Sequence, residues 1–138
     1  MNKNEMKILY LPIKQVYYDA IMAGRKVQEF REVRPTTIKK LLQLDKDGYE
    51  IEDEDGNSLP VAYDAIAFAV GYNKDRDTAL VEVVGSHCEI FADDQGEAIT
   101  YEQGRDEYGS PLVWVAEQVV YDLGKVLEHN IREKSKKI

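Results

Sequence analysis

Three short apolar runs constrain the fold of this chain more than any other feature. They cover residues 65–72, 80–84 and 112–121, and valine, isoleucine, alanine and aromatic residues dominate them. Runs of this length favour buried strands, because helices in globular proteins usually need ten residues or more. We therefore expect three central strands that share one core, with Trp114 at least partly buried.

Weaker local signals predict the remaining elements, which are strands over 6–13, 26–33 and 78–91, a helix over 14–23, and a short helix capped by Thr36 or Thr37. Gly24 is a suitable stop for the first helix, and Gly85 is the expected bend in the long strand. The order of these elements lacks an alternation of strand and helix. It predicts an α+β domain built around a small curved sheet or barrel of about five or six strands, with two short helices near the N-terminus.

The length of 138 residues predicts a single domain over residues 1–128. Two segments look like additions to it: an acidic hairpin over 45–60, indicated by Asp55-Gly56, and an irregular insertion over 92–111. Residues 129–138 form a basic tail, and we find no internal repeat in the sequence.

Composition excludes several classes of protein. No apolar stretch approaches the roughly 18–20 residues of a membrane-spanning helix, and charges interrupt residues 1–10, where a signal peptide would be apolar. Cys88 is the only cysteine, which excludes an intrachain disulfide and a multi-cysteine zinc site. We expect a cytoplasmic protein without a membrane partner.

Charge is distributed unevenly along the chain. The net charge is −8, but residues 1–40 carry +5 and residues 41–128 carry −16. Because nucleic-acid affinity depends on lysine and arginine near phosphates, we expect the N-terminal cations, including Arg34, Lys39 and Lys40, to form a positive patch.

The sequence does not contain a complete form of the common cofactor-binding or metal-binding motifs. No glycine-rich loop has the spacing of a dinucleotide or phosphate loop. Asp45, Asp47, Gly48 and Glu54 fall at calcium-loop offsets, but Gln43 occupies the first ligand position. His87-Cys88-Glu89 lacks the further cysteines of a zinc deaminase, and strand neighbours point to opposite faces. We expect no metal and no cofactor.

The segment from Gly24 to Arg31 is different. Gly24, Lys26, Glu29 and Arg31 reproduce G-x-K-x-x-E-x-R, and the chain thereby resembles the ASCH domains of the PUA-like superfamily. The preceding Leu11-Pro12-Ile13-Lys14, the aromatic helix with Tyr17 and Tyr18, Val70-Gly71-Tyr72 and Tyr121-Asp122-Leu123-Gly124 also resemble that family.

The resemblance implies a PUA-like β-barrel with a groove bordered by the motif. Relatives are regarded as RNA-binding modules, and a few as amidohydrolases acting on acylated cytidine or as ribonucleases. The amidohydrolases join the lysine to a threonine three residues later and to a downstream glutamate. This chain has Glu29 in place of the threonine, and Glu102 or Glu107 could serve as the downstream acid.

We interpret the chain as a domain that binds RNA or a nucleoside-sized ligand through Gly24, Lys26, Glu29, Arg31 and a stacking tyrosine, Tyr17 or Tyr18. The alternatives are a small hydrolase in which Lys26 and Glu29 are catalytic, and a non-enzymatic protein-interaction module. In a regular strand, Lys26 and Glu29 would face opposite sides. They share a groove only if Lys26 lies in the turn before the strand, and Gly24 favours that arrangement.

Overall fold

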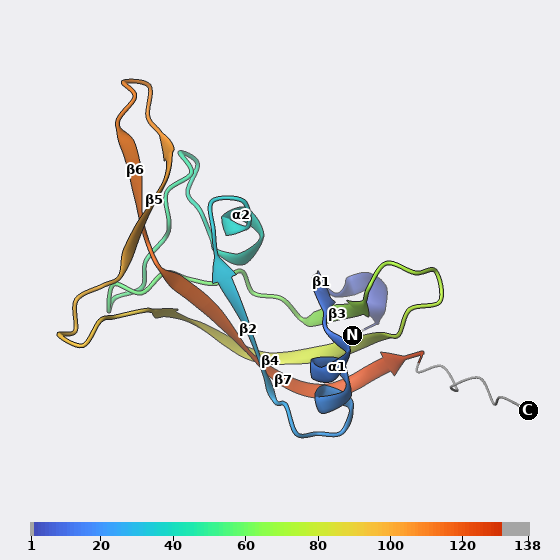
Figure 1. Cartoon of the computed structure of the whole chain (residues 1–138). Helices are drawn as coiled ribbons and strands as arrows, with labels where there is room; N and C mark the ends of the chain where they lie inside the picture. The colour runs from blue at the N-terminus through green and yellow to red at the C-terminus, as the bar shows by residue number, and fades with distance from the viewer. Residues whose placement is uncertain (1, 131–138) are drawn as a thin grey trace, which may run out of the picture. The chain divides into compact units, whose positions relative to one another are not determined.

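The computed structural model describes residues 2–130, and strands dominate it (Figure 1). Its elements are η1 (Lys3–Glu5), β1 (Ile8–Ile13), α1 (Gln15–Met22), β2 (Gln28–Val33), α2 (Ile38–Leu41), β3 (Ala65–Val70), β4 (Thr78–Ile90), β5 (Thr100–Arg105), β6 (Pro111–Val115) and β7 (Glu117–His129). The predicted α+β class with two short helices early in the chain is confirmed. Within residues 2–130, no helix has the length and apolar character needed to cross a membrane.

The strands form two sheets. One has the order β1-β3-β4-β7-β2, and the other is the β5–β6 hairpin. β1 pairs with β3 in parallel, and β3 pairs with β4 antiparallel. Neither sheet closes on itself in the described part of the chain, so the predicted barrel stays a prediction.

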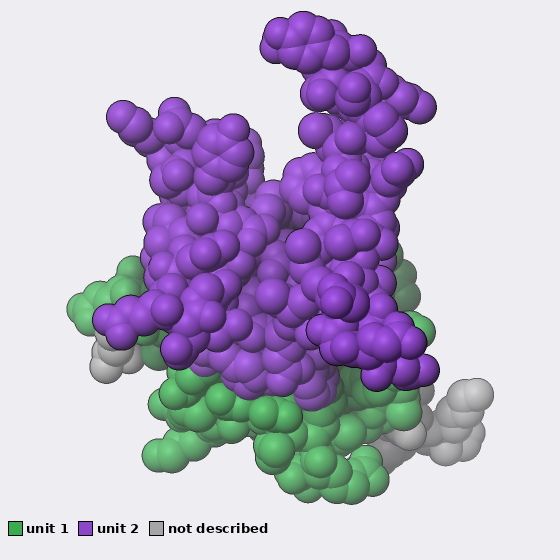
Figure 2. Space-filling model, turned by 90° about the vertical axis from the view of Figure 1, so that its left-hand side faces the viewer, with its two compact units in different colours: residues 1–29, 62–85, 121–138 green, residues 30–61, 86–120 purple. Residues whose placement is uncertain are grey.

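The chain divides into two compact units (Figure 2). Unit 1 comprises residues 1–29, 62–85 and 121–138, and unit 2 comprises residues 30–61 and 86–120. The strands β2, β4 and β7 each contribute residues to both units. The single-domain organisation predicted from length stays a prediction, because compactness alone does not define a unit that folds separately.

Unit 1 has a core of alternating strand residues and one helix face. Leu9, Leu11 and Ile13 of β1 are buried while Tyr10 between them is exposed, as the two-residue period of a strand requires. Helix α1 contacts β3 and buries Tyr18 and Ile21, which lie three residues apart on one face. The first predicted strand and helix are therefore confirmed to within two residues.

Unit 2 contains a recurring turn that was not among the predicted elements. The pattern Asp-x-x-Gly occurs at Asp45–Gly48, Asp53–Gly56, Asp93–Gly96 and Asp106–Gly109. In every copy the aspartate carboxylate accepts hydrogen bonds of 2.9–3.0 Å from the backbone N–H groups two and four residues later. Each glycine has a positive φ, between 79° and 87°. The four turns share one local geometry, and the absence of a longer internal repeat stays a prediction.

Two predicted segments need correction. Residues 92–111 are not irregular, because they hold two Asp-x-x-Gly turns joined by β5, and their status as an insertion stays a prediction. The expected strand over 112–121 is two strands, since Ala116 separates β6 from β7. Trp114 is half-buried as predicted and its Nε1–H donates to the Gln103 carbonyl at 2.7 Å, but it lies in the two-stranded sheet.

The acidic hairpin predicted over 45–60 consists of isolated bridges around the first two turns, such as Glu52 with Ser58. The C-terminal tail lies mostly outside the described residues. His129 ends β7, Asn130 follows it, and the remainder of the predicted basic segment is not described.

Candidate functional site

The turn between α1 and β2 positions Lys26. Gly24 follows the helix with a φ of +76°, and the N–H groups of Arg25 and Lys26 both donate to the Ala20 carbonyl, at 2.9 and 3.1 Å. The strand begins only at Gln28. Lys26 therefore lies before the strand, as expected, and is free of the strand alternation that would separate it from Glu29.

Lys26 meets two of the predicted site residues within unit 1. Its Nζ lies 3.4 Å from Oε1 of Glu29 and 5.5 Å from the centre of the Tyr17 ring. The Lys26 side chain is 18% exposed and the Glu29 side chain 8%, whereas Tyr17 is half exposed. We call Tyr17, Lys26 and Glu29 the Lys26 cluster. It presents a largely desolvated cation beside an accessible aromatic ring, where cation–π attraction is stronger than at a fully exposed site.

The structure distinguishes the two candidate tyrosines. Tyr18 is buried in unit 1, and its hydroxyl donates to the Thr78 carbonyl at 2.9 Å. Burial, followed by the nearby charges of Asp77 and Asp19, raises the pKa of Tyr18. Tyr18 is thus a core residue with a satisfied hydroxyl, and Tyr17 is the tyrosine beside Lys26.

The other predicted residues belong to unit 2. Arg31 lies on β2 two residues after Glu29, on the same face by strand alternation, and is half-buried. Glu102 is exposed on β5, and Glu107 is exposed in the turn that follows it. Their suitability as the downstream acid of a catalytic site stays a prediction.

One cation of the expected positive patch, Arg34, is neutralised by a carboxylate. Arg34 lies 2.6 Å from the Glu32 carboxylate, and its guanidinium stacks 4.8 Å from the centre of the Tyr101 ring. Lys39 and Lys40 are exposed in the last turn of α2. Together with the Lys26–Glu29 pair, this arrangement leaves fewer uncompensated cations than the sequence count suggests.

Unit 2 holds a carboxyl pair that sequence reasoning missed. Glu117 is 5% exposed and shares a hydrogen bond with the Glu50 carboxyl group. The Oε2 atom of Glu50 accepts from the Ser58 hydroxyl at 2.5 Å. Burial, followed by the hydrogen bond and the charge of Glu50, raises the pKa of Glu117 to about 8. Glu117 also lines a cavity of about 210 Å³ with Arg34 and Tyr101. The only sequence signal was an isolated glutamate inside an apolar run.

Cys88 and His87 do not form a nucleophile and its base. Burial, followed by the charges of Glu117 and Glu50, raises the pKa of Cys88 to about 12, so its thiol stays protonated at neutral pH. His87 instead pairs with the exposed Glu89 at 3.0 Å. The part of the chain that the structure describes contains no group of three or more metal-ligating side chains.

Comparison with family models, curated proteins and solved structures finds no match for this chain. The resemblance to ASCH domains therefore stays a prediction based on the motif residues and their surroundings.

Proposed function

We propose that the chain binds a nucleoside-sized ligand at the Lys26 cluster. One observation carries the proposal: the Lys26 ammonium is held, mostly out of water, between the buried Glu29 carboxylate and the accessible Tyr17 ring. A cation, an acceptor and an aromatic face are the three kinds of group that recognise a base and its polar substituents.

Each member of the cluster has a defined role in this proposal. The Tyr17 ring stacks on the base, and the Lys26 ammonium donates to a carbonyl or phosphate oxygen of the ligand. The Glu29 carboxylate accepts from an exocyclic amino group such as that of cytosine. The resemblance carried by the same motif supports the ASCH-type barrel as part of the proposal, and the single cysteine of the chain fits a cytoplasmic location.

Charge favours a nucleoside over a long RNA. The chain has a net charge of −8, and two cations of the expected patch, Lys26 and Arg34, are already paired with carboxylates. Binding of RNA depends on cations that neutralise several phosphates, so its affinity should be low and salt-dependent. A single nucleoside needs no such row of charges.

Hydrolysis is the second candidate, and the Lys26–Glu29 distance of 3.4 Å favours it. A lysine and a carboxylate this close could exchange a proton with a water molecule attacking an acyl group. Release of acetate from N4-acetylcytidine would identify this activity. The protein-interaction module is the outcome if neither binding nor turnover is found.

The test is calorimetric titration of the full chain with cytidine, N4-acetylcytidine and a ten-nucleotide single-stranded RNA at two salt concentrations. Lys26→Met keeps the aliphatic stem beside Tyr17 and removes the charge. Lys14→Met is the matched control, because Lys14 is an exposed lysine of the same unit. We expect nucleoside binding that Lys26→Met weakens about tenfold or more and Lys14→Met leaves unchanged. Equal effects of both variants would contradict the proposal.

A further inference from the structure

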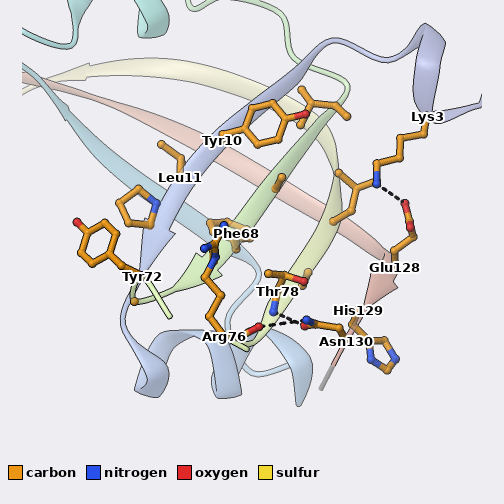
Figure 3. Close-up of a pocket in the computed structure, with 17 residues that line it drawn as sticks. Lys3, Tyr10, Leu11, Phe68, Tyr72, Arg76, Thr78, Glu128, His129 and Asn130 are labelled. Atoms are coloured by element: carbon orange, nitrogen blue, oxygen red, sulfur yellow. Dashed lines mark hydrogen bonds and ion pairs between the residues drawn. The ribbon is translucent and has the colours of Figure 1, made fainter. Parts of the chain in front are cut away.

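Unit 1 contains a separate cavity of about 490 Å³ over β1, β3 and β4 (Figure 3). It shares no lining residue with the Lys26 cluster. Tyr10 and Pro12 of β1 point to the face opposite the buried Leu9, Leu11 and Ile13, and they stand beside Ala67 and Ala69 of β3 in the sheet register. The cavity therefore lies over the sheet face opposite Leu9 and Ile13, and buried Leu80, which pairs with Ala67, also lines it.

The shape of the cavity comes from small side chains between large ones. Ala67 and Ala69 leave the centre of this face low, whereas Tyr10 and Tyr72 stand at its rim and are 68% and 92% exposed. Apolar hollows of 300–1,000 Å³ with a few polar groups are typical of small-molecule sites. Two exposed rings beside a flat floor favour a planar apolar ligand.

Hydrogen bonds hold the rim of the cavity in place. The Asn130 side chain donates to the Arg76 carbonyl at 3.1 Å and accepts from the Thr78 N–H, while the Asn130 N–H donates to the Thr78 carbonyl at 3.2 Å. These bonds fasten the end of β7 to the segment that begins β4. The site is thus preformed, which reduces the entropy lost when a ligand binds.

The charge of the lining favours an anion. Lys3 and Glu128 neutralise each other at 3.3 Å, which leaves Arg76 as the uncompensated charge among the lining residues. Within residues 2–130 the Arg76 guanidinium has no hydrogen-bond or ion-pair partner, and Figure 3 shows it directed into the cavity. Its neighbours Asp75 and Asp77 do not line the cavity, and Asp77 accepts from Gln15 at 3.2 Å.

We propose that this cavity binds a small aromatic anion, with its planar body on the Ala67–Ala69 floor between Tyr10 and Tyr72 and its anionic group on the Arg76 guanidinium. A guanidinium can hold a carboxylate, sulfonate or phosphate through two parallel hydrogen bonds. The proposal does not depend on the function assigned to the Lys26 cluster, because the two sites have no residue in common.

Two fluorescent probes of similar shape test it: 1-anilinonaphthalene-8-sulfonate, which is an anion, and N-phenyl-1-naphthylamine, which is neutral. Arg76→Gln should weaken binding of the anion about fivefold or more and change binding of the neutral probe less than about twofold. Lys74→Gln removes one positive charge from the same loop outside the cavity and is the matched control. If Lys74→Gln and Arg76→Gln weaken the anion equally, the proposal is overturned.

The apolar part is tested by Tyr72→Ala and Ala69→Leu, which should each weaken both probes. Tyr72 is 92% exposed, so its removal leaves the core intact even if the leucine at the floor disturbs folding. Ala62→Leu, at an exposed alanine of the same unit that does not line the cavity, is the control for the leucine. Probe binding that survives Tyr72→Ala unchanged would also overturn the proposal.

Discussion

Within residues 2–130, each of the two units buries one glutamate, and the two units neutralise it by opposite means. Glu29 of unit 1 is 6% exposed and lies beside the Lys26 ammonium. Glu117 of unit 2 is 5% exposed and shares a hydrogen bond with a second carboxyl group, that of Glu50. A buried charge is costly unless it is paired or removed. A neighbouring cation neutralises the charge of Glu29, whereas Glu117 avoids a buried charge by keeping its proton.

The contrast separates a candidate ligand site from a pH-sensitive structural pair. The Lys26 cluster has an accessible ring beside its ion pair, so a ligand can reach it. The Glu117–Glu50 pair is instead a place where the folded state holds a proton that the unfolded state releases.

Glu117→Gln should change the pH dependence of stability most. The folded pKa of Glu117 is about 8 and its ordinary value is 4.5, so its contribution to stability is complete below about pH 4.5 and is lost as the pH rises to 8. Glutamine keeps the hydrogen bond to Glu50 without titrating. The difference in unfolding free energy between wild type and variant should therefore shift by about 3 kcal/mol between pH 5.5 and pH 8, in favour of the variant at high pH.

Urea unfolding at several pH values measures this difference. Glu97→Gln, at an exposed glutamate of the same unit, should show no comparable shift. A difference between wild type and Glu117→Gln that is independent of pH would mean that Glu117 is ionised in the folded protein.

Lys26→Met should cost about 2 kcal/mol of unfolding free energy, because it removes the cation 3.4 Å from a buried carboxylate. The loss is smaller than for a fully buried pair, since the Lys26 side chain is 18% exposed. In a double-mutant cycle with Glu29→Gln, the two losses should be less than additive by about 1 kcal/mol. Additive losses would show that the two side chains do not interact.

The exposed acids of unit 2 use a third means of neutralisation, the backbone N–H groups of the turns. Asp53→Ala should cost about 1 kcal/mol, because its carboxylate accepts from the N–H groups of Asp55 and Asn57 at 2.9 Å. Asp55→Ala, in the same turn, should change stability by less than about 0.5 kcal/mol. Chemical unfolding of the two variants side by side compares them, and equal losses would remove the assigned role of the repeated aspartate.

The reactivity of the Cys88 thiol should respond to a change in the Glu117–Glu50 pair, and this effect should be small. Its pKa of about 12 predicts alkylation by iodoacetamide at pH 8 that is far slower than that of an unfolded control. Glu117→Gln should accelerate the reaction only a few-fold, about two- to fivefold, because burial and not the Glu117 charge is the largest cause of the raised pKa. Acceleration to the rate of the unfolded control would show that Glu117 dominates.

The early part of the chain was predictable because its signals are local. Alternation in β1, the helical spacing of Tyr18 and Ile21, and the stop at Gly24 are all encoded within a few residues. The position of Lys26 before β2 followed from the same glycine. The contacts of Lys26 with Tyr17 and Glu29 depend only on this local turn between α1 and β2.

The errors concern features that depend on distant residues or on weak repetition. The break at Ala116 is invisible in an apolar run, because it arises where the Ala116 N–H and carbonyl bond to Ile99 and Phe91. The Glu117–Glu50 pair joins residues far apart in the sequence. The Asp-x-x-Gly turns were not predicted because only the aspartate and the glycine recur among the four copies, and two shared residues are a weak sequence signal.

An amide NMR titration of the isotope-labelled full chain with cytidine and N4-acetylcytidine tests nucleoside binding at the Lys26 cluster most directly. We expect saturable shifts at Lys26, at Glu29 and at Tyr17, with smaller changes elsewhere in residues 2–130, and the loss of these shifts in Lys26→Met. Saturable shifts confined to the cavity of Tyr10, Tyr72 and Arg76, or no shifts at millimolar ligand, would contradict the claim that the Lys26 cluster is a nucleoside site.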